Sequence, residues 1–156
     1  MGIDSERQVR CPVFCGVDPG REKFGIAVGS YGKLFFSAII PYVKLNLALN
    51  YLFTGNSLEV AEWRQEGSPY NFGELRGVFL GDGTFHGEYE KGLRARKIDY
   101  VVTDERMTTI EARVLYWRLH PPRALLRLVP IQWRVPPRPI DDLAAWAIMK
   151  RALSRT

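Results

Sequence analysis

Short apolar runs separated by tight turns dominate the first forty residues of the chain. The runs at 13–18, 24–29 and 33–40 are rich in β-branched and aromatic residues, and Gly-containing turns lie between them. This spacing predicts three antiparallel strands in a meander, which Pro41 ends.

The remaining sequence alternates between helical and strand-like patterns. Residues 43–66 carry leucines at helical spacing and are expected to be mostly helical. Further strands are expected within 77–84 and 98–105, and further helices over 87–97, from Thr108 to about His120, and from near Ile140. The "TTIE" segment is typical of a capping box, with Thr108 as the N-cap and Glu111 reaching back.

These elements predict one α/β domain that spans residues 1–156. A chain of 156 residues is long enough to bury a core, and no linker divides it. Three meandering strands followed by two crossover units predict a mixed five-stranded sheet, three strands antiparallel and two parallel, flanked by helices. Residues at about 120–139 are rich in proline and arginine and are expected to form an extended arm.

The net charge of +5 is unevenly distributed. Residues 106–156 contain 10 basic and 3 acidic residues, and nine of the ten are arginines. Because guanidinium binds phosphate through a planar pair of donors, this segment favours a polyanionic partner. The alternative is a basic surface that has no partner.

Other features bound the class of protein. No run of about 18 apolar residues indicates a membrane span, and the polar N-terminal stretch lacks the apolar core of a signal peptide. A cytoplasmic protein without a membrane partner is therefore expected. If Cys11 and Cys15 share the first strand they lie roughly 13 Å apart, too far for a disulfide, so both are expected to be reduced core residues.

Acidic residues recur at the ends of the predicted elements. Asp18 ends the first strand, Asp104 and Glu105 end the last one, and Asp141 and Asp142 open the last helix. If the two strands are neighbours, these carboxylates converge on one edge of the sheet and repel one another. A divalent cation relieves that repulsion, and oxygen-only ligands favour Mg²⁺ or Mn²⁺.

Each acid also has a purely structural interpretation. Asp18 precedes Pro-Gly and is a common type of turn residue. Asp141 or Asp142 suits a helix N-terminus, and Asp82 in "GDGT" suits a turn.

Four motifs resemble the RuvC/YqgF group of Holliday-junction-resolvase-like proteins. They are "GVDPGREKFGIAV", "GDGT", "DERMTTIEA" and "IDDLAAWAI", in the order in which the family has them. The resemblance implies an RNase H-like fold and a metal-dependent nuclease, more readily an endonuclease than an exonuclease, that cleaves branched DNA or structured RNA. In the YqgF branch it also implies maturation of a ribosomal RNA precursor.

The resemblance also implies roles for individual residues. Asp18 bridges two metal ions, Asp104 or Glu105 holds one of them, and Asp141 holds the other, with Asp142 as an additional candidate. Neighbouring strand residues point to opposite faces, so only one of Asp104 and Glu105 can easily join Asp18, and Asp104 is favoured slightly. Nucleic-acid contacts are expected from Arg21, Lys23, Arg106, Arg113, Arg118, Arg123, Arg127, Arg134 and Arg138, and Trp133 either stacks on a base or anchors the arm.

Two other functions compete with this interpretation. The first is a non-catalytic nucleic-acid-binding protein that keeps the RNase H-like fold. The second is an actin-like ATP binder, which needs two such domains and is disfavoured by the length of the chain. The sequence does not separate DNA from RNA substrates, and it is compatible with a homodimer without indicating a dimer face.

Overall fold

The three apolar runs near the start of the chain form the predicted antiparallel meander. The computed structural model describes residues 11–68 and 74–156. The meander consists of β1 (Phe14–Asp18), β2 (Lys23–Ser30) and β3 (Lys33–Pro41), and β5 (Gly77–Gly81) and β6 (Tyr100–Thr103) extend the sheet from β1 in parallel. The mixed α/β class and the directions of these five strands are as expected.

The sheet has six strands rather than the expected five. The additional strand, β4 (Arg64–Gly67), pairs with the outer edge of β3 and gives the order β4-β3-β2-β1-β5-β6. Its residues are polar, so their pattern gave no strand signal, and backbone pairing with β3 determines their conformation. The rest of the stretch expected to be helical forms α1 (Leu45–Thr54) between short 3-10 segments at Tyr42–Lys44 and Ser57–Trp63.

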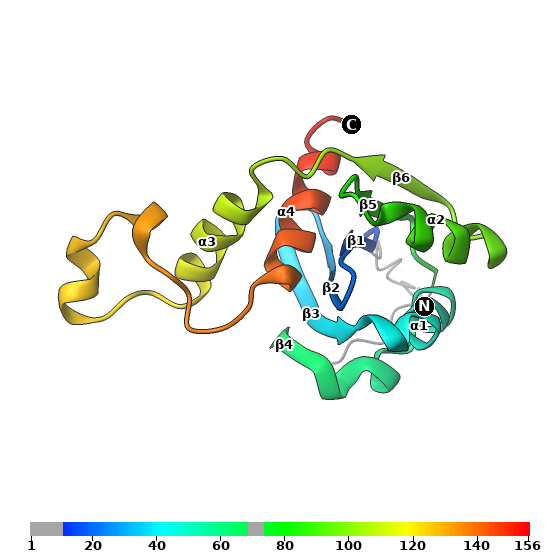
Figure 1. Ribbon diagram of the computed structural model, residues 1–156, viewed down its shortest axis with the longest axis horizontal. Helices are drawn as coiled ribbons and strands as arrows, with labels where there is room; N and C mark the ends of the chain where they lie inside the picture. Colours follow the sequence, from blue (N-terminus) through cyan, green and yellow to red (C-terminus); the bar gives the residue numbers. More distant parts are fainter. Residues whose placement is uncertain (1–10, 69–73) are drawn as a thin grey trace, which may run out of the picture.

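Helices cover the two faces of the sheet unequally (Figure 1). Large side chains, including Phe24 and Ile26, point into the core beneath α1 and α2 (His86–Ala95). The opposite face of β1 and β2 carries Gly16 and Gly25, and α4 (Asp141–Leu153) lies directly on them. A Cβ on either glycine would overlap a backbone carbonyl of α4, so the helix and the two strands meet main chain to main chain.

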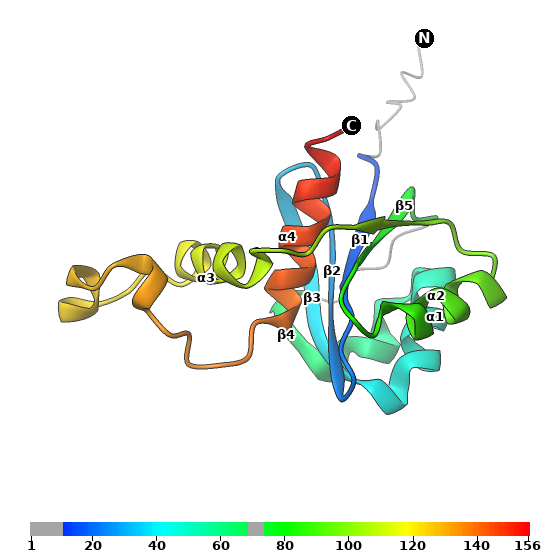
Figure 2. The same cartoon turned by 45° about the horizontal axis from the view of Figure 1, so that its top comes forward.

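The helix after β6, α3 (Thr108–Leu119), packs on α4 and leads into the arm, which projects away from the sheet (Figure 2). The predicted capping box is wrong. Met107 occupies the cap position in a left-handed conformation, with φ 68°, while the Thr108 hydroxyl donates to the Glu105 carbonyl over 2.7 Å. Glu111 instead forms an ion pair with Arg151 on α4.

The arm is an ordered structure with two short 3-10 helices, Ala124–Leu128 and Ile131–Trp133. Arg134 stabilises the fold of the arm, because its guanidinium donates to the carbonyls of Val129 and Arg127 over 2.7 and 2.9 Å. The indole N–H of Trp117 on α3 in turn donates to the Arg134 carbonyl. Hydrogen bonds to its backbone therefore fix the arm, and the two short helices interrupt the extended conformation that was expected.

The two cysteines are free thiols in different environments. Cys15 on β1 is a buried core residue, as expected, but Cys11 precedes the strand and is exposed, so that part of the expectation is wrong. In the described parts of the chain, no helix combines the length and apolar character needed to cross a membrane.

Candidate functional site

Asp18 lies at the end of β1, where the chain turns through Pro19 and Gly20. The turn is fixed from α2: the Tyr89 hydroxyl donates to the Gly20 carbonyl and accepts from the Gly20 N–H. Burial raises the pKa of Asp18 to about 8, and repulsion from Glu105 and Asp141 adds to that effect. Three carboxylates from distant parts of the sequence therefore act on one another at this edge of the sheet.

Glu105 is held in place by the loop that follows β5. The backbone N–H of Asp82 donates to the Thr103 carbonyl, and the Asp82 carboxylate accepts from the Glu105 N–H, both over 3.0 Å. Gly81 and Gly83 flank Asp82, and a Cβ on either of them would overlap the Glu105 carboxylate. The "GDG" sequence thus forms a cradle for Glu105, in which both glycines are needed for space.

The Glu105 carboxylate is poorly compensated in this cradle. Burial, followed by the neighbouring Asp82 charge, raises its pKa, and a backbone hydrogen bond from Gly83 opposes that shift. Its Oε2 atom is buried and has no hydrogen-bond partner in the structure. A buried carboxylate oxygen without a partner is costly, and a bound cation would remove that cost.

Asp104 points away from this group. Its carboxylate accepts hydrogen bonds from the Arg106 backbone and guanidinium at 2.9–3.1 Å, and these bonds lower its pKa to about 2. Of the two adjacent acids, it is therefore Glu105 that faces Asp18, although the sequence slightly favoured Asp104. Strand alternation does not apply to either acid, because β6 ends at Thr103, before both of them.

The two acids at the start of α4 have different surroundings. Asp141 pairs with Lys23 at the beginning of β2, with 3.2 Å between the charged atoms, and acts on Asp18. Asp142 is fully buried, accepts from the Ser37 hydroxyl over 2.6 Å and is paired with Arg138. The structure brings Asp141 to the candidate site and leaves Asp142 outside it.

The donor set fits a hard divalent cation in its chemistry. Asp18, Glu105 and Asp141 offer only carboxylate oxygens, which suit Mg²⁺ or Mn²⁺. Within the described residues, no three His, Cys, Asp or Glu side chains lie close enough to form a ready-made metal-binding group. The carboxylates are near enough to repel one another but are not closed around a single point.

The predicted nucleic-acid-binding residues fall into two groups. Two of them form ion pairs within the protein, Arg106 with Asp104 and Arg138 with Asp142 and Glu66. Three others donate to backbone carbonyls: Arg113 to Gln132, Arg127 to Pro122, and Arg134 to two residues of the arm. Arg21 lies over the Phe85 ring at 5.8 Å, and Lys23 pairs with Asp141. Arg118 and Arg123 are exposed and form no such contact in the described structure.

The arm nevertheless presents an unusual surface. Residues 112–140 contain six arginines and no acidic residue. Trp133 is 75% exposed, so it does not anchor the arm in the core. Leu125 and Leu128 are similarly exposed nearby in the sequence.

Sequence reasoning missed two residues that build the site. It took Asp82 for a simple turn residue, although the pair of glycines around it was a signal for close approach by another group. Tyr89 gave no signal, because its partner is a backbone carbonyl 69 residues away.

The comparisons with known proteins add no relative. No protein-family model matches this sequence, and a search of curated proteins finds no significant match. The resemblance to the RuvC/YqgF group therefore depends on the four motifs alone.

Proposed function

We propose that this protein is a divalent-metal-dependent nuclease with an RNase H-like fold that acts on structured nucleic acid. The observation that carries the proposal is the group formed by Asp18, Glu105 and Asp141, in which burial and mutual repulsion raise the pKa of Asp18 to about 8. A protein that only needed a turn at Asp18 would gain nothing from placing two more acids beside it.

The RNase H-like assignment is supported by the strand directions and the motif order. A three-stranded meander followed by two parallel strands agrees with that fold, with β4 as an addition at the far edge. The acids at the end of β1, after β6 and at the start of α4 are those that the family resemblance implies. Glu105, rather than Asp104, is the member of its pair that we assign to the site.

Mg²⁺ or Mn²⁺ would be held by Asp18, Glu105 and Asp141. The ion would supply an activated water and charge stabilisation for the leaving oxygen of a phosphodiester. The protein's own part is positional: the cradle at 81–83 orients Glu105, and Tyr89 fixes the turn behind Asp18. Lys23 offsets the charge of Asp141.

Nucleic acid is the substrate that the charge distribution supports. The acid-free stretch 112–140 leads into α4, whose first residue is Asp141, so a strand bound along it would run toward the site. Arg123 is available for phosphates, and Trp133 is available for stacking on an unpaired base.

The experiment is a cleavage assay on a labelled four-way DNA junction and a folded RNA with Mn²⁺. We expect Asp18→Asn and Glu105→Gln each to lower the cleavage rate roughly 100-fold or more while binding is kept. Asp104→Asn is the matched control, because it changes an adjacent carboxylate that points away, and it should retain most of the activity. Equal cleavage by all four proteins would refute the proposal.

A non-catalytic nucleic-acid-binding protein is the second candidate. It is favoured by the lack of a ready-made metal-binding group among the described residues. Binding of the junction or the RNA without turnover, at several Mn²⁺ concentrations and with wild-type protein, would support this candidate over the nuclease.

A further inference from the structure

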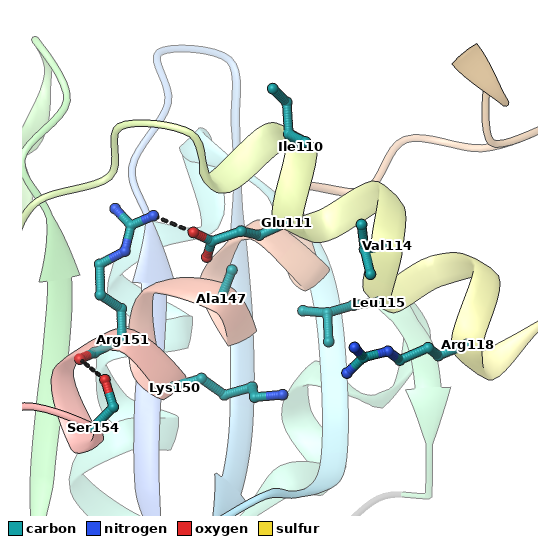
Figure 3. A pocket seen from close by; sticks show the side chains of 9 residues that line it. All are labelled: Ile110, Glu111, Val114, Leu115, Arg118, Ala147, Lys150, Arg151 and Ser154. Atoms are coloured by element: carbon teal, nitrogen blue, oxygen red, sulfur yellow. Dashed lines mark hydrogen bonds and ion pairs between the residues drawn. The ribbon is translucent and has the colours of Figure 1, made fainter. Parts of the chain in front are cut away.

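A groove between α3 and α4 plays no part in the proposed chemistry. It encloses about 450 Å³, within the usual range for ligand sites, and both helices line it (Figure 3). Its centre is aliphatic, with Ile110, Val114 and Leu115 on α3 and Ala147 on α4. Ile110 is 40% exposed, which is high for an isoleucine on a helix that packs against another.

Two cations meet at one end of this groove. Arg118 on α3 and Lys150 on α4 point toward one another across it (Figure 3). The Lys150 ammonium lies 5.0 Å from the centroid of the Trp146 ring, which helps to fix its position without neutralising it. Among the described residues, neither cation has an acidic partner.

The opposite end of the groove carries no net charge. There Glu111 and Arg151 neutralise each other in an ion pair, and Arg151 also donates to the Asp104 carbonyl over 2.8 Å. The groove therefore has one positively charged end, an aliphatic centre and one end without net charge.

We propose that the α3–α4 groove binds a small single-headed anion, an aliphatic chain that carries one carboxylate or phosphate. The head would lie between Arg118 and Lys150, and the chain would cover Val114, Leu115 and Ala147. This site is separate from the proposed nuclease centre.

Two other occupants fit the groove less well. A peptide or a nucleic-acid strand would bring polar backbone or base edges against the aliphatic centre, where the lining side chains offer no hydrogen-bond partner. A base would also gain nothing from stacking, since none of the described residues that line the groove is aromatic.

The test is a titration of the intact, methyl-labelled protein with octanoate, followed by NMR and calorimetry. Octanoate should shift the methyl signals of Ile110, Val114, Leu115 and Ala147 saturably. The double variant Arg118→Gln/Lys150→Gln should weaken binding by about tenfold or more, since two charge-assisted contacts are lost. The matched control Arg123→Gln/Arg155→Gln removes the same charge elsewhere and should change the affinity by less than about twofold.

Three results would overturn the proposal. One is the absence of a saturable shift at these methyl groups. Another is equal affinity for the neutral 1-octanol, which would remove the role of the cations. The third is a twelve-nucleotide single strand that shifts the same methyl signals and displaces octanoate, which would assign the groove to nucleic acid. The readout needs neither metal nor cleavage, so it is independent of the proposed nuclease.

Discussion

Asp141 and Asp142 are neighbours in the first turn of α4, but their carboxylates contact different parts of the protein. The Asp141 carboxylate pairs with Lys23 and acts on Asp18, whereas that of Asp142 is buried against Arg138 and Ser37. Arg138 also binds Glu66 on β4, so Asp142 is part of a network that ties the base of the arm to the sheet. One acid of the pair is therefore available for chemistry, and the other is structural.

This difference predicts unequal effects of removing the two carboxylates. Asp142→Ala should lower the free energy of unfolding by about 3 kcal/mol, because Arg138 keeps only Glu66 as an acidic partner and the buried Ser37 hydroxyl loses its acceptor. Asp141→Ala should cost less than about 1 kcal/mol, since its pair with Lys23 is partly exposed. Urea unfolding of both variants measures this, and equal losses would contradict the division of roles.

The raised pKa of Asp18 predicts how the stability of the metal-free protein depends on pH. Between its ordinary pKa of 3.8 and its folded pKa of about 8, the native state holds a proton that the unfolded state releases, so stability falls as the pH rises through this window. Above pH 8 the cost is complete. Asp18→Asn abolishes it, and should therefore stabilise the protein more at pH 9 than at pH 5, by on the order of 4 kcal/mol for the three pH units between pH 5 and the folded pKa.

Thermal unfolding of both proteins in a chelator measures this difference. The side chains that face Asp18, namely Glu105, Asp141 and Tyr89, are the same in both proteins, so the difference between the two pH values reports on Asp18 and its contacts. A stabilisation by Asp18→Asn that is equal at both pH values would show that Asp18 is ionised throughout.

The cradle around Glu105 predicts a variant that keeps the fold and damages the site. At Gly83 the three atoms nearest to the added methyl of Gly83→Ala all belong to the Glu105 carboxylate, which can swing away at little cost in stability. We expect a change of less than about 1 kcal/mol in the free energy of unfolding, together with a loss of Mn²⁺-induced thermal stabilisation. Gly87→Ala on α2 is the matched control, because its methyl meets nothing within 4 Å and Mn²⁺ should stabilise that variant as it does the wild type.

The contact between α4 and the strands predicts a severe effect at Gly25. A methyl there would overlap the backbone of Asp141, which cannot move without displacing α4 from β2. Gly25→Ala should therefore cost roughly 3 kcal/mol or more. Gly32→Ala should cost only about 1 kcal/mol, because that glycine has φ of 70° but open space around it. Comparable denaturation midpoints for the two variants would contradict the close packing.

The strongly patterned parts of the fold could be predicted from the sequence, and the weakly patterned parts could not. The meander, β5 and the last helix follow from apolar periodicity, because each buries a continuous face. β6 was predicted from its β-branched composition, although Val101 and Val102 are exposed. β4 has no such pattern, since Arg64–Gly67 gains its conformation from backbone pairing at the edge of β3. The capping box predicted at the start of α3 is wrong because the Thr108 hydroxyl donates to the Glu105 carbonyl instead of accepting from a backbone N–H of the helix.

The candidate site was predictable to the level of element ends but not of side-chain direction. The sequence predicted convergence on the condition that the first and last strands are neighbours, and that condition is wrong, because β5 lies between β1 and β6. Glu105 and Asp141 nevertheless act on Asp18, Glu105 from the loop after β6 and Asp141 from the start of α4. Which of Asp104 and Glu105 turns inward depends on Asp82 and Arg106, and the choice between Asp141 and Asp142 depends on Arg138. These are contacts between segments whose relative placement a single sequence does not give.

The backbone contact of α4 with Gly16 and Gly25 has a consequence for how this protein can change over time. Because main chain rather than bulky side chains sets the spacing between Asp141 and Asp18, apolar residues elsewhere in the core can be exchanged for others of different size without moving that spacing. Core residues can be substituted during evolution while the two carboxylates keep their separation, so long as Gly16 and Gly25 remain glycine.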